Sequence, residues 1–247
     1  MGGRAFGSSR RMSSIHRDAW RLFGIPIRVS PSWFFVAGFV AWSLARGYFP
    51  SRYPQFSVGV CWLLGVAAAL LLFTCVVLHE LGHSLVAKRE GIGVACVTLF
   101  IFGGVSQITS HPARPSSELR VALAGPLVSL LIAWICSALL SAVRMPFAVA
   151  ALLQYLAVAN IALAVFNMLP GFPLDGGRVL RALLWAWSGS LRRATRIASS
   201  IGVLFGGALL TWGAWIMLRG IIGSGVWYLL LGSFLFRTAR ASYRSAA

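Results

Sequence analysis

Six stretches of the chain are apolar enough, and about long enough, to cross a lipid bilayer as helices. A spanning helix needs roughly 20 mostly apolar residues, with about 17 to 25 tolerated. The first and last stretches are short. We therefore predict an all-α membrane fold with six transmembrane helices. The stretches are Pro31–Tyr48, Val58–Ala87, Leu119–Val143, Pro146–Leu169, Ile197–Leu218 and Ile221–Phe236.

The segment between the second and third spans has a different pattern. From Gly91 to Ser110 it is rich in β-branched and aromatic residues, and glycines interrupt it at its start and middle. This composition predicts a short β-hairpin. Open strand edges cannot face lipid, so we expect a membrane-associated hairpin that protein covers or that lines a wet cavity. The alternative is a hairpin lying on the cytoplasmic membrane surface.

A second irregular segment, Asn167–Gly177, closes the fourth span. Pro170 and Pro173 cannot continue a regular helix, and the glycines around Asp175 permit turns that other residues avoid. We therefore predict a broken helix end that carries a carboxylate.

The charge pattern supports a membrane protein and gives its orientation. Only 11% of residues are charged, against about 25% in soluble domains. The net charge is +17, but the basic residues fall between apolar segments, so we predict no nucleic-acid partner. With the N-terminus in the cytoplasm, nearly all of the 22 Lys and Arg lie on the cytoplasmic side, which predicts that both termini are cytoplasmic. The exceptions are Arg46, Arg52, Arg144 and Arg219.

The domain organisation follows from these segments. We predict a basic, partly disordered N-terminus over 1–30, one polytopic membrane domain over 31–240 and a short tail over 241–247, with disorder in the first eleven residues. About thirty polar residues precede the first apolar stretch, so we expect an anchor there and not a cleaved signal. The four cysteines show no C-x-x-C spacing, which favours buried thiols.

The chemistry is concentrated in His79-Glu80-Leu81-Gly82-His83, inside the second span. Histidines at i and i+4 lie on one face of a helix, so both rings can reach one tetrahedral Zn²⁺. Glu80 lies beside them and can accept a proton from a zinc-bound water. Ionisable side chains are costly within a membrane, so such a cluster indicates function.

Asp175 is the candidate third ligand. It alone among the five acids ends an apolar span without being needed as the base. The second and fourth spans run in the same direction, so His83 and Asp175 both lie near the cytoplasmic surface. Two histidines and a carboxylate leave one position open on a single Zn²⁺, as in catalytic sites.

Other interpretations stay open at this point. Buried polar groups could hold helices together, the cluster could relay protons in a transporter, or the protein could be an inactive scaffold that binds membrane segments. His16 and His111 lie in polar segments, and we expect them to be solvated.

Four motifs in order resemble the site-2 protease family of intramembrane zinc metalloproteases. The likeness runs from about Gly24 to Leu183. The motifs are His79–His83, Phe102-Gly103-Gly104, Ala124-Gly125-Pro126 and Asn167-x-x-Pro-x-x-Pro-Leu-Asp-Gly-Gly177.

The resemblance implies zinc ligands at His79, His83 and Asp175, the catalytic acid/base at Glu80, and an Asn167 that helps hold the substrate or its developing oxyanion. It also implies substrates that are membrane proteins, cut within or near a transmembrane segment in regulated intramembrane proteolysis, often after a first cleavage. The hairpin at Gly103 and Gly104 could bind the unwound substrate by strand addition. By analogy we expect a bacterial plasma membrane, and no nucleotide-sensing module of the CBS type, because the sequence stops at Ala247. The oligomeric state is left open.

Overall fold

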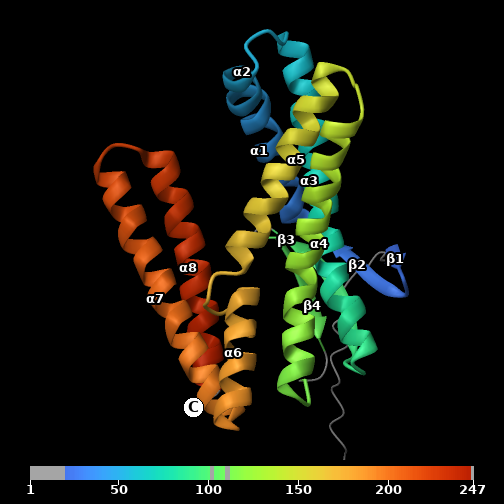
Figure 1. Cartoon of the computed structure of the whole chain (residues 1–247). Coiled ribbons are helices and arrows are strands. Elements are labelled where there is room, and N and C mark those ends of the chain that lie inside the picture. The colour runs from blue at the N-terminus through green and yellow to red at the C-terminus, as the bar shows by residue number, and fades with distance from the viewer. Residues whose placement is uncertain (1–19, 101–102, 109–111, 246–247) are drawn as a thin grey trace, which may run out of the picture.

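The structure is a computed structural model that describes residues 20–100, 103–108 and 112–245. Most of these residues are helical, and a small sheet lies beside the helices (Figure 1). The first eleven residues, which we expect to be disordered, lie outside the described residues. His16 and His111 also lie outside them. The helices are α1 (Pro31–Ser43), η1 (Leu44–Tyr48), α2 (Phe49–Arg52), α3 (Val58–Arg89), α4 (Pro115–Ala142), α5 (Phe147–Asn167), α6 (Asp175–Ser188), α7 (Leu191–Leu218) and α8 (Ile222–Ser245).

The first predicted span is a bent helical path. The π-helical turn η1 and the short helix α2 follow α1 directly, so the path extends to Arg52. Pro50 has no N–H to donate to the carbonyl of Arg46, and its ring crowds that carbonyl. Prolines and π-helical turns are the usual causes of helix bends. The widened turn just before Pro50 therefore has a local cause in the sequence.

Four helices in the described part of the chain are long and apolar enough to cross a membrane, judged by length and composition: α3, α4, α5 and α7. They correspond to the second to fifth predicted spans. α1 has 13 residues, and the 24-residue α8 ends in a stretch with three arginines. The helical membrane fold is thus confirmed, and the count of six spans stays a prediction.

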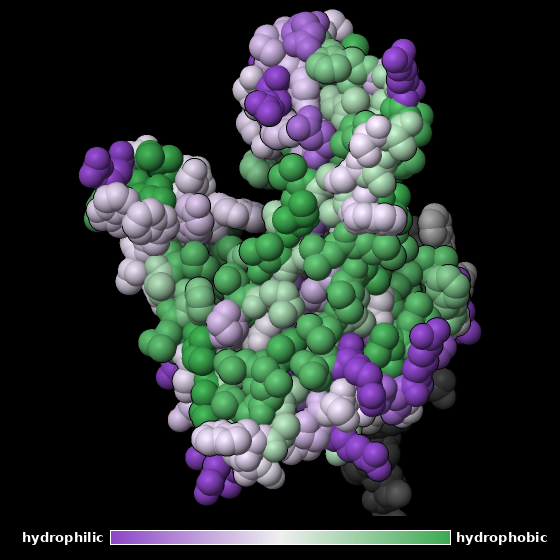
Figure 2. All heavy atoms as spheres, in the orientation of Figure 1, coloured by the Kyte–Doolittle hydropathy of each residue, from purple (hydrophilic) through white to green (hydrophobic). Residues whose placement is uncertain are grey.

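The outer surface of the helices is apolar over the middle of the molecule. Figure 2 shows hydrophobic residues over a broad band of the visible face, with the most hydrophilic residues towards its ends. Phe35, Trp134 and Leu204 are among the many large apolar side chains that are largely exposed. Exposed apolar area of this extent is typical of contact with lipid or with another protein.

The predicted hairpin is confirmed, and it belongs to a larger sheet. The sheet has the order β1-β2-β3-β4, with β2 and β3 parallel and the other pairs antiparallel. β1 and β2 come from the segment before the first span, which lies within the predicted basic, partly disordered N-terminus over 1–30. β4 is an edge strand of this sheet. The strands are β1 (Trp20–Leu22), β2 (Ile25–Val29), β3 (Val94–Phe100) and β4 (Gly103–Ile108).

α3 lies at the centre of the helices and packs on α4 through a close contact at Gly82. A β-carbon at Gly82 would lie 2.8 Å from Val128 Cγ2 and 3.0 Å from the carbonyl oxygen of Ala124. The two helices therefore approach each other closely between the two histidines of α3. α7 and α8 form a separate pair, and α6 lies between this pair and α4 (Figure 1).

Candidate metal centre

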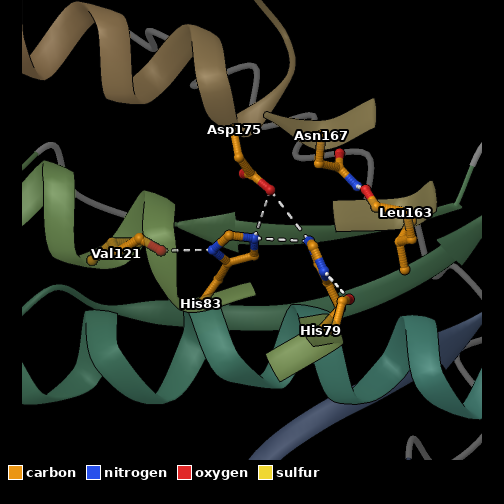
Figure 3. A network of polar contacts seen from close by, with 7 residues as sticks. His79, His83, Val121, Leu163, Asn167 and Asp175 are labelled. Carbon is orange, nitrogen blue, oxygen red and sulfur yellow. Dashed lines mark hydrogen bonds and ion pairs between the residues drawn. The ribbon is translucent and has the colours of Figure 1, made fainter. Parts of the chain in front are cut away.

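His79 and His83 lie one turn apart on α3, and both are buried. Their Nε2 atoms face each other at 3.2 Å, and the rings meet edge to face (Figure 3). The spacing of four residues therefore has the predicted effect, because it brings both rings to one point beside the helix.

Asp175 reaches the same point from another helix. It is the first residue of α6 and is buried. Its Oδ2 lies 3.2 Å from His79 Nε2 and 3.1 Å from His83 Nε2 (Figure 3). The structure thus brings together the three side chains that the sequence analysis proposed as metal ligands.

The other nitrogen of each ring has a partner on α4. Nδ1 of His83 lies 2.7 Å from the carbonyl oxygen of Val121, and Nδ1 of His79 lies 2.9 Å from Ser129 Oγ. A carbonyl can only accept, so Nδ1 of a neutral His83 carries the proton and Nε2 presents a lone pair. The Ser129 hydroxyl can accept from Nδ1 of His79 in the same way.

The three atoms fit a zinc ion. Zn–N and Zn–O distances of roughly 2.0 to 2.1 Å imply ligand atoms about 3.3 Å apart in a tetrahedron. The observed separations are 3.1 to 3.2 Å. Two ring lone pairs and a carboxylate oxygen that converge in this way repel one another unless a cation lies between them. Two histidines with one carboxylate are also a known ligand set of catalytic zinc.

Glu80 lies next to His79 on α3 and is half-buried. Gly104 of β4 packs against its side chain, so closely that a β-carbon at Gly104 would overlap Glu80 Cγ. The sheet therefore meets α3 at the acid that the sequence analysis proposed as the base. Gly103, the first residue of β4, pairs with Phe100 of β3.

Gly125 of α4 closes the other side of the cluster. A β-carbon at this position would collide with Nε2 of both His83 and His79. The absence of a side chain at Gly125 thus provides the space in which the ligand atoms converge. The glycine was part of a motif in the sequence, but only the packing gives its role.

The loop before Asp175 is held by close glycine contacts. Gly176 packs on the carbonyl of Met168 at the end of α5, and Gly202 of α7 packs on the backbone of Phe172. The N–H of Phe172 also donates to the carbonyl of Ala198, at 3.3 Å. The loop is therefore fixed between α5 and α7, and this sets the position of Asp175.

Asn167 is the last residue of α5 and is half-buried. Its Nδ2 donates to the carbonyl of Leu163, one turn earlier, at 3.0 Å (Figure 3). The side-chain amide N–H thus points to its own helix. A role of Asn167 in holding substrate stays a prediction.

Sequence reasoning did not find Ser129 and Val121. Ser129 could have been recognised from the sequence, because it is a polar residue inside a strongly apolar span, where polar side chains are often functional. Val121 could not, because it acts through its backbone carbonyl. Both lie on α4 and meet α3 only in the folded chain.

Comparisons with known proteins agree with this geometry. A model of peptidase family M50 matches residues 67–146 and 142–209. A candidate zinc metalloprotease of Synechocystis sp. is 39% identical over 246 residues, which cover 100% of this chain and 62% of that relative. Rip3, a candidate zinc metalloprotease of Mycobacterium tuberculosis, is 37% identical over 223 residues, which cover 89% of this chain and 56% of Rip3. The chain thus spans only about three fifths of the length of these relatives.

A solved structure is also similar. The site-2 protease from Methanocaldococcus jannaschii superposes with a TM-score of 0.62 at 28% sequence identity. The match covers 92% of this chain and 94% of that chain.

Proposed function

This chain belongs to peptidase family M50, and from that membership we propose that it is an intramembrane zinc metalloprotease. In this proposal it hydrolyses peptide bonds within or near the transmembrane segments of other proteins. The family and the four long apolar helices make it an integral membrane protein.

One observation carries the proposal: Nε2 of His79, Nε2 of His83 and Oδ2 of Asp175 converge within 3.2 Å of one another. We assign these residues as the ligands of one Zn²⁺ per chain. A bound zinc ion supplies a Lewis acid that polarises the scissile carbonyl and acidifies a water molecule. Val121 and Ser129 hold the rings so that both Nε2 atoms face Asp175 Oδ2, where such an ion would be held.

Glu80 is the proposed acid/base. It is half-buried beside His79, on the side of α3 that meets β4. A carboxylate there can take the proton of the attacking water and then pass it to the leaving amine. Its partial exposure allows water to reach it, while the three ligands are buried.

β4 is the proposed binding strand for the substrate. A helical substrate buries its peptide bonds, so it must unwind before it is cut. An extended peptide that pairs with the edge of a sheet lies about 4.8 Å from the edge strand. Because Gly104 contacts Glu80, a peptide beside β4 would also lie near the proposed base. Gly103, Gly104 and Asn167 are the proposed substrate-binding residues.

We propose six spans, including the α1–η1–α2 path and α8, within a membrane domain over 31–240, with both termini in the cytoplasm. The distribution of Lys and Arg supports this orientation. Regulated intramembrane proteolysis in a bacterial plasma membrane is proposed by analogy with the family.

The decisive experiment is the zinc-to-protein ratio of the detergent-purified chain. We expect a ratio near one, lost in a His79→Ala, His83→Ala double variant, and cleavage of a membrane-spanning substrate by the wild type alone. A wild-type chain that stays metal-free when zinc is supplied would contradict the proposal and would favour a proton relay or a scaffold.

A further inference from the structure

We infer that the buried ion pair between Glu118 and Arg181 positions Asp175 for metal binding. The inference rests on the proposed zinc site. Glu118 and Arg181 thereby have a positioning role and do not themselves touch the ligand atoms. Neither the sequence motifs nor the spacing of the proposed ligands identifies them.

Glu118 lies in the first turn of α4 and is completely buried, with an exposed fraction of 0%. Its Oε1 accepts a hydrogen bond from Nε of Arg181 at 2.6 Å and a second, short one from Nη2. Its Oε2 has no hydrogen-bond partner among the described residues. A carboxylate that is buried in this way needs a positive partner, so Glu118 ties α4 to the helix that carries Arg181.

Arg181 also holds the loop that precedes the third ligand. It belongs to α6, and its guanidinium carbon lies 4.8 Å from the centre of the Phe172 ring. Phe172 precedes Asp175 by three residues. The end of this loop sets the position of Asp175, the first residue of α6. Arg181 thus contacts both α4 and this loop.

A single face of α4 then contacts both helices that carry the proposed ligands, α3 and α6. Glu118, Val121, Gly125 and Ser129 are three or four residues apart, so they form one stripe along the helix. Val121 and Ser129 orient the two histidines, and Gly125 leaves space for them. Glu118 completes the stripe by fixing α6, so that one helix aligns α3 with the start of α6.

Arg178 adds to the same electrostatic cluster. It lies one turn before Arg181 on α6, and its charge interacts with Asp175, Glu118 and Glu80. Arg178 and Arg181 thus place positive charge near the carboxylates around the proposed zinc site. This arrangement keeps Asp175 in its place before a metal binds, which lowers the reorganisation that binding requires.

The test measures zinc affinity of the full chain in detergent by competition with a chelator. We expect Glu118→Gln to weaken zinc binding by about 10- to 100-fold, as is typical when a residue that orients a ligand is lost. Co²⁺ in place of zinc should give altered visible bands, because the geometry of the three ligands changes. Glu90→Gln is the matched control, because the half-buried Glu90 pairs with the exposed Arg120 of α4 at 2.8 Å, and no ion pair between described residues joins Glu90 to α6. We expect it to keep wild-type affinity.

A double variant separates positioning from stability. Replacing both partners of a buried pair by apolar residues often leaves stability unchanged, so Glu118→Met with Arg181→Met should fold even if Glu118→Gln does not. We expect the metal-free double variant to melt near the wild-type temperature and still to bind zinc about 10- to 100-fold more weakly. Wild-type affinity and wild-type Co²⁺ bands in this variant would overturn the inference. A wild-type chain without zinc would instead overturn the proposed function on which the inference rests.

Discussion

Gly104 of β4 lies directly against the side chain of Glu80 on α3, and no β-carbon fits between them. The edge strand of the sheet and the proposed base are thus in contact. The residues lie 24 positions apart in the sequence and on elements of different type, so the contact depends on the docking of the sheet onto α3.

Gly104→Val should push Glu80 or β4 aside and slow cleavage by about 100-fold, because displacing a reacting group by roughly 1 Å can cost that much. Zinc content should stay at the wild-type value, since the three atoms nearest to the new β-carbon all belong to Glu80 and not to a proposed ligand. The measurement is turnover of a membrane-spanning substrate beside the metal-to-protein ratio. Gly59→Ala is the control, because a β-carbon there meets nothing within 4 Å; normal turnover by the Gly104 variant would rule out this role of the contact.

Glu80→Gln should leave zinc binding intact and reduce cleavage by about 100- to 10,000-fold, the usual contribution of a general base. The amide keeps the shape of the side chain but cannot accept the proton. Metal content and single-turnover cleavage, measured on the same preparation, test this. Full activity in the glutamine variant would exclude Glu80 as the base.

Gly125→Ala should abolish zinc binding. The new methyl group would occupy the space between Nε2 of His83 and Nε2 of His79. Loss of the hydrogen-bond partner of a metal ligand typically weakens metal binding by about 10- to 100-fold. We expect Gly125→Ala to reduce zinc affinity by at least this factor. Gly207→Ala on α7 is the control, because its β-carbon would meet open space. If the Gly125→Ala variant keeps a zinc-to-protein ratio near one, zinc must bind at a site other than His79, His83 and Asp175.

Ser129→Ala should weaken zinc binding by about 10-fold, because it removes the partner of His79 Nδ1 and lets that ring turn. Ser137→Ala is a suitable control on the same helix, since the Ser137 hydroxyl donates to the carbonyl of Ala133 and to no other group among the described residues. Chelator competition gives both affinities. Equal affinities in the two variants would mean that packing alone orients His79.

Much of the fold was accessible from sequence because its signals are local. The limits of α3 follow from a continuous apolar run, and the turn before α6 follows from Pro170, Pro173 and the glycines near them. The hairpin of β3 and β4 was predicted from β-branched residues and glycines. The two additional strands were not, because β2 pairs in parallel with β3 across α1 and α3, and a pairing at that distance leaves no mark on the segment itself.

For the site, the sequence by itself determined which groups can bind a metal. The i, i+4 spacing of His79 and His83 fixes their common face once the segment is helical, because one turn takes 3.6 residues. The scarcity of acids singled out Asp175. The tertiary structure alone decided that Asp175 reaches the same point, that Val121 and Ser129 of α4 turn the rings, and that Gly104 meets Glu80. These contacts join elements that are far apart in the chain, and they depend on helix packing distances that no local pattern of residues encodes.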